Sequence, residues 1–405
     1  MNERVGALDK NCSGCGACAI ICPRNAITLQ LDQEGFYTAA IDDTRCIHCG
    51  KCESVCVCEE VHDATQLKNS KVLAAQSKST SVVNSSTSGG IAYEMAKSAF
   101  LEGMGVVGVV YNFEHNRAQS VLAKSLNDIE RFRGSKYIQS YTINAFKEML
   151  SDMKKNPEIR YLVFGTPCQI YGIASVLERQ QLRDRAVLVD LFCHGVPSYL
   201  VWDEYIDSVC RRLNTLKLSN INFRDKSIGW HNFVMRVSSE TGEYKASSEE
   251  DLFYHAFFDN VLLARACYTC SVRQDISKAD IRLGDYWGRR FQAHEDGVSA
   301  ILILSGRGEA FLQGIHDSLV FFDSGSINEV LASQSVQHYN TIPFREKAFN
   351  DLKNGESLKS TIRTYRKNFP ASKRFFLALK ENSAKLPIWL RIPLRKMYKQ
   401  IQEIL

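Results

Sequence analysis

Cysteine carries the clearest chemical pattern in this 405-residue chain, which contains 14 of them. Eight near the N-terminus fall into two copies of one spacing, CSGCGACAIICP and CIHCGKCESVC. In such runs the first three thiolates bind one 4Fe–4S cluster and the fourth binds the cluster of the other copy. The predicted ligands are therefore Cys12, Cys15, Cys18 and Cys56 for one cluster, and Cys46, Cys49, Cys52 and Cys22 for the other.

Zinc is the alternative for clustered cysteines, but zinc sites rarely repeat this triple spacing. The second copy has Val57 where the first has a proline, and Cys58 is left over as an ordinary thiol. Residues 1–62 resemble a bacterial-type dicluster ferredoxin.

Four cysteines farther along the chain could form another site. Cys168 follows the apolar run YLVFG, Cys193 follows AVLVDLF, and Cys267 and Cys270 form a Cys-x-x-Cys pair. Ligands of open α/β sheets collect beyond the carboxyl ends of strands. Four cysteines suffice for a third 4Fe–4S cluster. A four-cysteine zinc site stays open, because spacing alone does not exclude it. Cys210 lies in an amphipathic stretch and is expected in the core.

Composition excludes several classes of protein. Fifty Lys and Arg against 45 Asp and Glu give a net charge of +5, too mild to indicate nucleic-acid binding. The start, MNERVGALDK, has no apolar segment, and no run of the chain reaches the length of a membrane span. Many cysteines without a signal peptide favour a reducing compartment, so we expect a cytoplasmic protein.

Short apolar runs alternate with amphipathic stretches in the larger part of the chain. Strands are predicted at 106–112, 160–165, 186–192 and 298–304, and helices at 91–102, 169–180, 199–213 and 306–316. This alternation predicts an α/β architecture with some parallel sheet, preceded by the ferredoxin-like head. The predicted division is a dicluster domain at 1–62, a polar surface linker at 63–86, an α/β domain at 87–330 and a helical, basic extension at 331–405.

Several motifs in this region resemble a known family. They are STSGGIAYEMAKSAFLEG (86–103), FRGSKYIQS (132–140), GTPCQ (165–169), CHGVPS (193–198) and CYTC with KADIRLGDYWG (267–288). In this order they resemble the family of coenzyme F420 hydrogenase and dehydrogenase beta subunits. WHNF (230–233) and YNTIPFREKAFNDLKNG (339–355) are most similar to bacterial members that accompany polysaccharide biosynthesis genes. The resemblance implies an iron–sulfur flavoprotein with FAD, and it supports the third cluster.

The predicted flavin residues lie in two glycine-containing stretches. Ser88, Gly89 and Gly90 precede a helix whose N-terminus could hold a pyrophosphate, although an ordinary capped helix would look the same. The second group is Gly134, Ser135 and Lys136. Lys136 could neutralise a reduced flavin, or it could be a solvated turn lysine.

Three polar residues lie beside the predicted cofactor segments. His194, Asp285 and His231 are candidate proton donors, with Lys136, His194 and Asp285 as the predicted catalytic set. Each of them could equally be a structural residue with satisfied hydrogen bonds.

The expected function is that of a flavin-dependent oxidoreductase. Electrons from ferredoxin or a partner protein would pass through three 4Fe–4S clusters to FAD, and then to a small molecule or, by the resemblance, to the deazaflavin coenzyme. The alternative is a non-catalytic electron-relay component of a larger redox complex. Residues 371–405 hold eight Lys or Arg and two Glu. Such a segment could contact a membrane surface, cover the domain or meet a partner.

Overall fold

A nine-stranded mixed sheet forms the centre of the molecule. The computed structural model describes residues 11–58, 64–274, 276–334, 342–383 and 386. The strand order is β16-β4-β15-β14-β9-β8-β5-β6-β7. In that order the strands are Leu319–Phe322, Lys71–Ser77, Ser299–Ile303, Ile281–Asp285, Ala186–Leu191, Tyr161–Phe164, Gly105–Asn112, Arg117–Leu122 and Ser140–Tyr141. All four predicted strands are confirmed, as β5, β8, β9 and β15.

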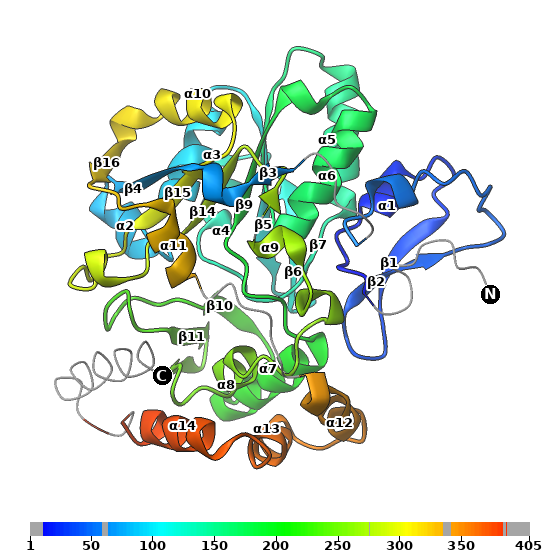
Figure 1. Cartoon of the computed structure of the whole chain (residues 1–405). Coiled ribbons are helices and arrows are strands. Elements are labelled where there is room, and N and C mark those ends of the chain that lie inside the picture. The colour runs from blue at the N-terminus through cyan, green and yellow to red at the C-terminus, as the bar shows by residue number, and fades with distance from the viewer. Residues whose placement is uncertain (1–10, 59–63, 275, 335–341, 384–385, 387–405) are drawn as a thin grey trace.

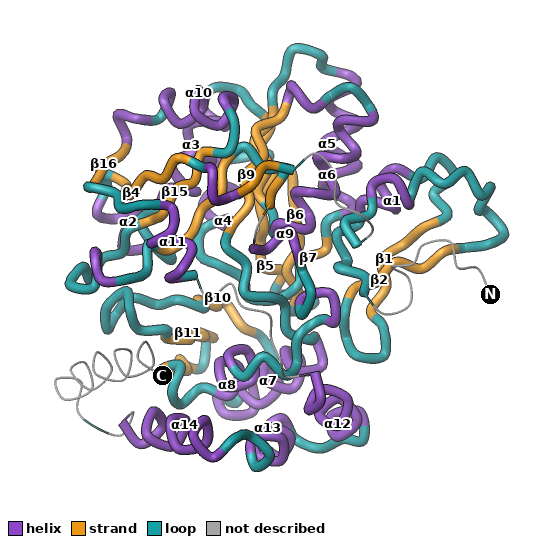
Figure 2. The backbone as a smooth tube through the Cα atoms, viewed as in Figure 1, coloured by secondary structure: helices purple, strands orange, loops and turns teal. Residues whose placement is uncertain are grey.

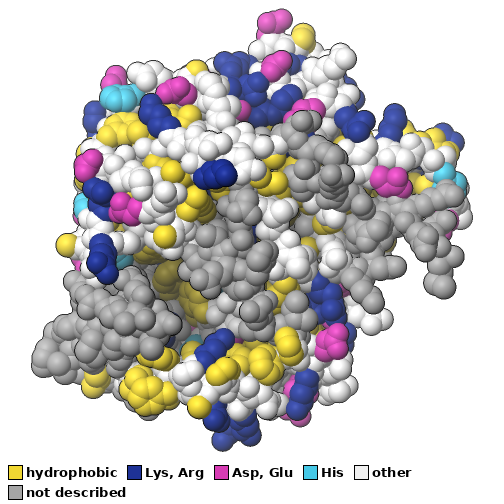
Figure 3. All heavy atoms as spheres, viewed as in Figure 1, with side chains coloured by type: hydrophobic (Ala, Val, Ile, Leu, Met, Phe, Trp, Pro, Cys, Tyr) yellow, Lys and Arg dark blue, Asp and Glu magenta, His cyan; other side chains and the backbone are white. Residues whose placement is uncertain are grey.

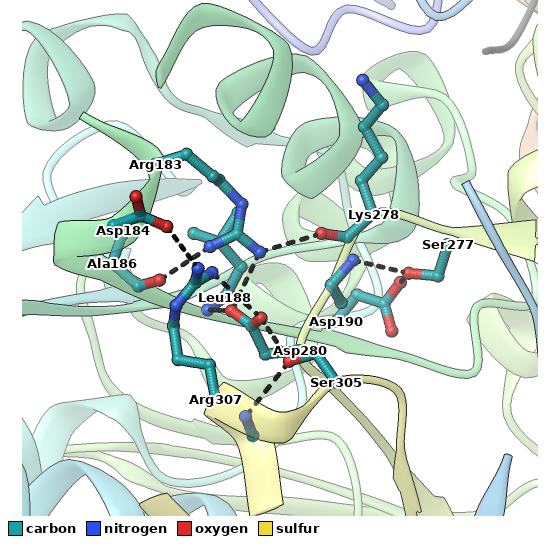
Figure 4. A network of polar contacts seen from close by, with 12 residues as sticks. Arg183, Asp184, Ala186, Leu188, Asp190, Ser277, Lys278, Asp280, Ser305 and Arg307 are labelled. Atoms are coloured by element: carbon teal, nitrogen blue, oxygen red, sulfur yellow. Dashed lines mark hydrogen bonds and ion pairs between the residues drawn. The ribbon is translucent and has the colours of Figure 1, made fainter. Parts of the chain in front are cut away.

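The four strands β14, β9, β8 and β5 run parallel in the middle of the sheet. Their carboxyl ends therefore meet at one edge, which is where Cys168, Cys193 and Asp285 lie. A polar network ties β14 to its neighbours at its amino-terminal end (Figure 4). There the Asp280 carboxylate accepts hydrogen bonds from Arg183 at 2.9 Å and from the backbone N–H of Leu188 at 2.8 Å. The network thus lies at the end of β14 opposite to the carboxyl ends of the parallel strands.

Helices cover both faces of the sheet (Figures 1 and 2). Helices α5 (Ile143–Lys155) and α6 (Pro167–Arg179) bury apolar side chains such as Met149 and Ile173 against one face. Helices α3 (Ile91–Leu101), α4 (Leu126–Phe132) and α10 (Gly306–Gly314) cover the other. The predicted helices at 91–102, 169–180 and 306–316 correspond to α3, α6 and α10. The mixed α/β architecture is thus confirmed.

The expected surface linker at 63–86 is wrong over much of its length. Residues Lys71–Ser77 form β4, which pairs with both β15 and β16 inside the sheet. Ala74 and Ala75 are fully buried there. The polar residues that suggested a linker fall at the strand end and in α2 (Thr80–Ser85). Small residues in a flanked strand give little hydrophobic periodicity, so the pattern concealed the strand.

A second, aromatic-rich layer lies below the sheet in Figure 1. It contains a three-stranded antiparallel sheet and the helices that pack around it. Its elements are β10 (Leu218–Asn222), β11 (Val234–Ser239), β12 (Gly242–Ser247), α7 (Tyr199–Leu213), α8 (Leu252–Phe258), α12 (Ile342–Lys353) and α13 (Leu358–Arg366). Trp202 stacks on Phe223 at its centre, with 5.1 Å between ring centroids. Helix α7 spans the predicted residues 199–213.

Five further elements belong to the body of the molecule. They are the paired strands β3 (Thr65–Gln66) and β13 (Ile276–Ser277), and the helices α9 (Ser271–Gln274), α11 (Ile327–Ser333) and α14 (Ala371–Ser383). The basic segment predicted for membrane or partner contact is 371–405, and its residues 384–385 and 387–405 lie outside the described residues. Within the described part of the chain, every helix is too short or too polar to cross a bilayer. On the face shown in Figure 3, basic and acidic side chains are intermixed.

The N-terminal head is fastened to the body at several points. It contains α1 (Ala17–Ile21), β1 (Ile27–Leu31) and β2 (Tyr37–Ile41), and α1 packs against α5 and α6. Gln139 accepts a hydrogen bond from the backbone N–H of Tyr37 at 2.7 Å and donates to the carbonyl of Ser13 at 3.1 Å. Arg345 of α12 pairs with Glu34 at 2.5 Å. These contacts hold the head in one position on the body.

Candidate functional site

Cys168 is delivered by a capped helix start at the end of β8. Thr166 is the N-cap of α6, Pro167 takes the first helical position, and Gln169 completes a capping box with Thr166. Each of these residue types is favoured at that position, because together they satisfy free backbone N–H groups without distorting the first turn. The sequence Thr-Pro-Cys-Gln therefore places the Cys168 thiol at the edge where the parallel strands end.

Cys193 and Cys267 approach each other through a glycine turn. Gly195 has a φ of 125°, and a Cβ there would lie 3.1 Å from Cδ1 of Leu263 and 3.4 Å from Cβ of Cys267. A larger residue would thus be strained and would push the two segments apart. Cys267 ends a short 3-10 helix, and Cys270 directly precedes α9. The structure brings these cysteines together with Cys168, because each of the four thiols lies within electrostatic range of others in the set.

Burial dominates the acid–base properties of this thiol group. It raises the pKa of Cys168 to about 12 and that of Cys193 to about 11, and it raises the pKa of Cys267 and Cys270 as well. Donors that oppose this effect are the backbone N–H groups of Gly195, Val196, Val272 and Arg273 and the hydroxyls of Thr166 and Ser13. Such a pocket disfavours free thiolates and suits thiolates that are bound to a cation.

A zinc ion and a 4Fe–4S cluster place different geometric demands on four thiolates. A zinc site requires all four sulfurs about 2.3 Å from one point. No group of three or more His, Cys, Asp or Glu side chains in the described part of the chain converges in this way. In a 4Fe–4S cluster each thiolate binds a different iron, so the sulfurs lie farther apart. The same lack of convergence holds for the predicted head ligands, so the four body thiols stay the predicted ligands of a third 4Fe–4S cluster, with zinc as the alternative.

The head contains a thiol group of its own around a small cavity of about 20 Å³. Its lining includes Cys12, Cys15, Cys18 and Cys56, the predicted ligands of one cluster. Cys58 lines the same cavity, although it was expected to be an ordinary thiol. The Sγ of Cys58 donates a hydrogen bond of 2.9 Å to the carbonyl oxygen of Asn11. The hydrogen bond with the Cys56 thiol, together with burial, raises the pKa of Cys58. Cys58 is thus a neighbour of the predicted ligands.

The other four predicted head ligands are half-buried or exposed. Cys49 is exposed, and Cys46 lies 3.7 Å from Nδ1 of His48. Cys22 accepts a hydrogen bond from the backbone N–H of Ala26 at 3.3 Å. Cys22 and Cys52 pack against the same small hydrophobic cluster as Cys12 and Cys18. The two head groups are therefore adjacent, and one of them faces outward.

The head and body thiol groups adjoin each other at Cys15. Cys168 is the strongest electrostatic neighbour of Cys15, ahead of the cysteines of its own group. This closeness depends on Gly172 of α6, where a Cβ would lie 2.8 Å from Cβ of Ala17 and 3.2 Å from Sγ of Cys15. Three thiol groups thus follow one another from the outer head to the sheet edge.

The body cysteines Cys168, Cys193, Cys267 and Cys270 form the third thiol group of this series. A cavity of about 1220 Å³ adjoins this third thiol group, because Cys193 is part of the cavity lining. It exceeds the range of about 300–1,000 Å³ that is typical of small-molecule sites. Figure 3 shows hydrophobic side chains in the hollow between the upper and lower parts of the view. Predicted residues in its lining are Ser88, Gly90, Gly134, Ser135, Lys136, Cys193, His194, His231 and Asp285. The structure therefore places both predicted flavin stretches and all three candidate proton donors around one space.

One end of the cavity has the features of an anion site. The first residues of α3 line it, so the N-terminal N–H groups of that helix face the space. Ser86 Oγ and Arg133 Nε also belong to cavity-lining residues, and both are buried without a hydrogen-bond partner among the described residues. Ser135 links the two loops, since its N–H donates to Oγ1 of Thr87 at 2.9 Å. These groups suit the pyrophosphate of a dinucleotide.

Gly89 has a packing role that the sequence did not indicate. It is absent from the cavity lining, and a Cβ there would lie 2.6 Å from the carbonyl oxygen of Ala75 in β4. Gly90 lines the cavity, but its φ of 85° and a Val82 methyl carbon 2.8 Å from the ideal Cβ also require glycine. The stretch 88–90, which was predicted to hold a pyrophosphate, is therefore partly a sharp turn between the sheet and α3.

Lys136 lies at the cavity with its ammonium group turned to backbone. Its Nζ donates hydrogen bonds of 3.0 Å to the carbonyls of Arg131, Phe132 and Arg133 at the end of α4. Burial, with the charge of Arg131, lowers its pKa to about 7. These carbonyls occupy all three N–H groups, so the predicted action on a reduced flavin would require the side chain to turn.

The candidate proton donors differ in their surroundings. Burial lowers the pKa of His194 to about 4, and its Nε2 lies 2.6 Å from Oδ1 of Asn260. The ring is therefore neutral at pH 7. Asp285 accepts a hydrogen bond of 2.7 Å from the indole N–H of Trp230 and pairs with Arg224 at 3.3 Å. His231 Nε2 lies 3.2 Å from the carbonyl oxygen of Phe291.

Arg224 is the most prominent cavity residue that sequence reasoning missed. Its guanidinium is buried, lies 3.8 Å from the ring centroid of Phe233 and donates to the hydroxyl of Tyr137 at 3.2 Å. Trp230 and Trp287 stack beside it, with 4.8 Å between centroids. The sequence shows only an arginine a few residues before WHNF, and an isolated arginine does not by itself indicate a buried site residue.

Comparison with known proteins identifies the family. Models of the coenzyme F420 hydrogenase/dehydrogenase beta subunit match residues 72–147 (N-terminal part) and 159–322 (C-terminal part). The chain belongs to this family. A 4Fe-4S dicluster domain model matches residues 11–59, which supports iron–sulfur clusters in the head.

Curated relatives come from methanogens. A component of the F(420)H(2) dehydrogenase of Methanosarcina mazei is 26% identical over 301 residues, covering 71% of this chain and 80% of the relative. An uncharacterized protein of Methanocaldococcus jannaschii is 22% identical over 352 residues, covering 77% of this chain and 89% of the relative. A chain of the F420-reducing NiFe hydrogenase complex from Methanosarcina barkeri is 18% identical, covers 75% of this chain and 94% of its own length, and has a TM-score of 0.42. None of these matches distinguishes the subgroup that accompanies polysaccharide biosynthesis genes, which stays a prediction.

Proposed function

We propose that this family member is an iron–sulfur flavoprotein oxidoreductase. It would exchange electrons with a redox partner at the head and act on a small substrate in the large cavity. The observation that carries the proposal is the unbroken series of thiol groups between these two places. Cys18 neighbours Cys52 of the outer group, Cys15 neighbours Cys168 of the body, and Cys193 lines the cavity.

The cofactors follow from what each place can hold. Each thiol group has four predicted cysteine ligands for a 4Fe–4S cluster, and the cavity has an anion-binding end and aromatic walls for FAD. When bound, these groups supply one-electron carriers and a flavin that exchanges one or two electrons. The chain itself would hold the pyrophosphate at the start of α3, and its aromatic side chains would exclude water from the reacting ring.

The cavity supports an enzyme over a pure relay. A relay protein would need an apolar docking face for its partner, whereas an enzyme needs enclosed space beside the flavin. A volume of about 1220 Å³, lined by Arg224, Asp285 and His231 among others, offers both space and polar groups. The Methanosarcina mazei relative is named as one of the subunits of an F(420)H(2) dehydrogenase, which supports a partner protein and makes the deazaflavin one candidate substrate.

The exposed outer thiol group is the place where a partner would exchange electrons. Cys49 is exposed, and the neighbouring Ile47 is 53% exposed. A ferredoxin or another partner protein that docks on this loop would approach the first carrier closely. The buried groups behind it would remain shielded from other oxidants.

Cofactor analysis of a cysteine variant tests the proposal. The full-length protein, purified without oxygen, should contain about twelve irons, matching acid-labile sulfide and one FAD. Cys168→Ala should lose about four irons, keep its flavin and lose flavin reduction by reduced ferredoxin. The matched control is Cys210→Ala, because Cys210 lies on α7 and belongs to none of the three predicted ligand sets. An unchanged iron content in Cys168→Ala would exclude the third cluster, and with it the proposed electron path from the head to the cavity.

A further inference from the structure

Two buried arginines lie against the third thiol group. Arg273 follows Cys270 by three residues and is 3% exposed. Its Nη1 donates to the carbonyl of His194, the residue after Cys193, at 3.2 Å. One guanidinium therefore bridges the two segments that carry Cys193 and Cys270.

Arg282 holds this arrangement from β14. It is fully buried, and it donates to the carbonyls of Arg273 at 3.0 Å and of Val272 at 2.9 Å, the end of the short helix α9. Asp190 of β9 receives two further bonds from it, at 2.7 and 2.5 Å. The pair is enclosed in the sheet, so Arg282 anchors the segment that places Arg273.

Both arginines also interact electrostatically with thiols of the group. The guanidinium groups of Arg273 and Arg282 lie within electrostatic range of both Cys193 and Cys270. The head differs, because the strongest electrostatic neighbours of Cys15 and Cys18 are other thiols and not cations. A negatively charged centre is therefore better stabilised at the third site than in the head.

We propose that Arg273, positioned by Arg282, supplies the charge that raises the reduction potential of the third cluster above that of the head clusters. Net charge near a cluster is one of the factors that set its potential. An electron that exchanges between the head clusters and the third cluster would then reside mainly on the third cluster, beside the cavity. The inference rests on the proposed function, since it assumes a cluster on Cys168, Cys193, Cys267 and Cys270.

Redox titration of full-length variants, followed by electron paramagnetic resonance, tests this role. Arg273→Gln should retain about twelve irons and shift the potential of one cluster to a more negative value, with the other two unchanged. Arg273→Lys should restore most of the difference. The control is Arg183→Gln, a partly buried arginine in the network of Figure 4, which should shift none of the potentials. Full iron with unchanged potentials in Arg273→Gln would overturn the proposal.

A second variant keeps the test decisive if Arg273→Gln loses iron. Asp190→Asn removes the negative charge beside Arg282, so the same potential should move in the positive direction. No shift, or a shift in the negative direction, would refute the charge argument. Failure of the proposed function looks different: the unmodified protein would then hold only about eight irons, and no third potential would be seen.

Discussion

The ion pair between half-buried Glu34 and buried Arg345 makes the attachment of the head open to a quantitative test. The Glu34 side chain is 19% exposed and the Arg345 side chain 1%, and their two hydrogen bonds are 3.0 and 2.5 Å long. Glu34→Gln leaves a buried guanidinium without its counter-charge. Removing one partner of a fully buried pair costs about 3–5 kcal/mol, and we expect at most about 3 kcal/mol because Glu34 is half-buried and the amide oxygen can still accept one bond.

Chemical denaturation with a matched control measures this cost. Lys71 and Glu309 pair at 2.9 Å, but their side chains are 60% and 56% exposed. Glu309→Gln should therefore change the free energy of unfolding by less than about 1 kcal/mol. The double variant Glu34→Met with Arg345→Met should be far less destabilised than Glu34→Gln, because no uncompensated charge remains. Equal effects of Glu34→Gln and Glu309→Gln would refute the reasoning.

The same pair predicts a loss of stability in acid. Burial raises the pKa of Glu34, but the hydrogen bonds and charge of Arg345 outweigh it, and the pKa lies below the ordinary 4.5. A carboxyl group with a lowered folded-state pKa contributes stability that is present above pH 4.5 and is lost as the pH falls through the folded value. Glu34→Gln should remove this part of the pH dependence.

Two further predictions address the ligands and the flavin. Cys58→Ala should retain about twelve irons whereas Cys56→Ala loses about four, and equal losses in iron analysis would make Cys58 a ligand. Ala92→Glu places a carboxylate at the exposed start of α3 inside the cavity, where it favours the helix dipole but repels a pyrophosphate. FAD content, read from flavin absorbance, should fall below that of Ala92→Gln with no loss of thermal stability. Stoichiometric FAD in Ala92→Glu would place the pyrophosphate elsewhere.

Local sequence features determined much of this protein. The repeated cysteine spacing predicted the head groups, because a cluster constrains ligands that are close together in the chain. The apolar runs and the helical spacing predicted strands and helices, including the helix that follows Cys168, because these patterns depend on neighbouring residues. The family motifs likewise pointed to the two loops that line the cavity.

Tertiary structure decided what depends on residues far apart in the chain. Only the parallel order of β8, β9 and β14 brings Cys168, Cys193 and Asp285 to one edge. Only the docking of α1 on α6 makes Cys15 a neighbour of Cys168, and only packing against β4 shows why residue 89 is glycine. The arginines at the third thiol group gave no local signal, because a buried charge is stabilised by partners that the fold supplies from elsewhere in the chain.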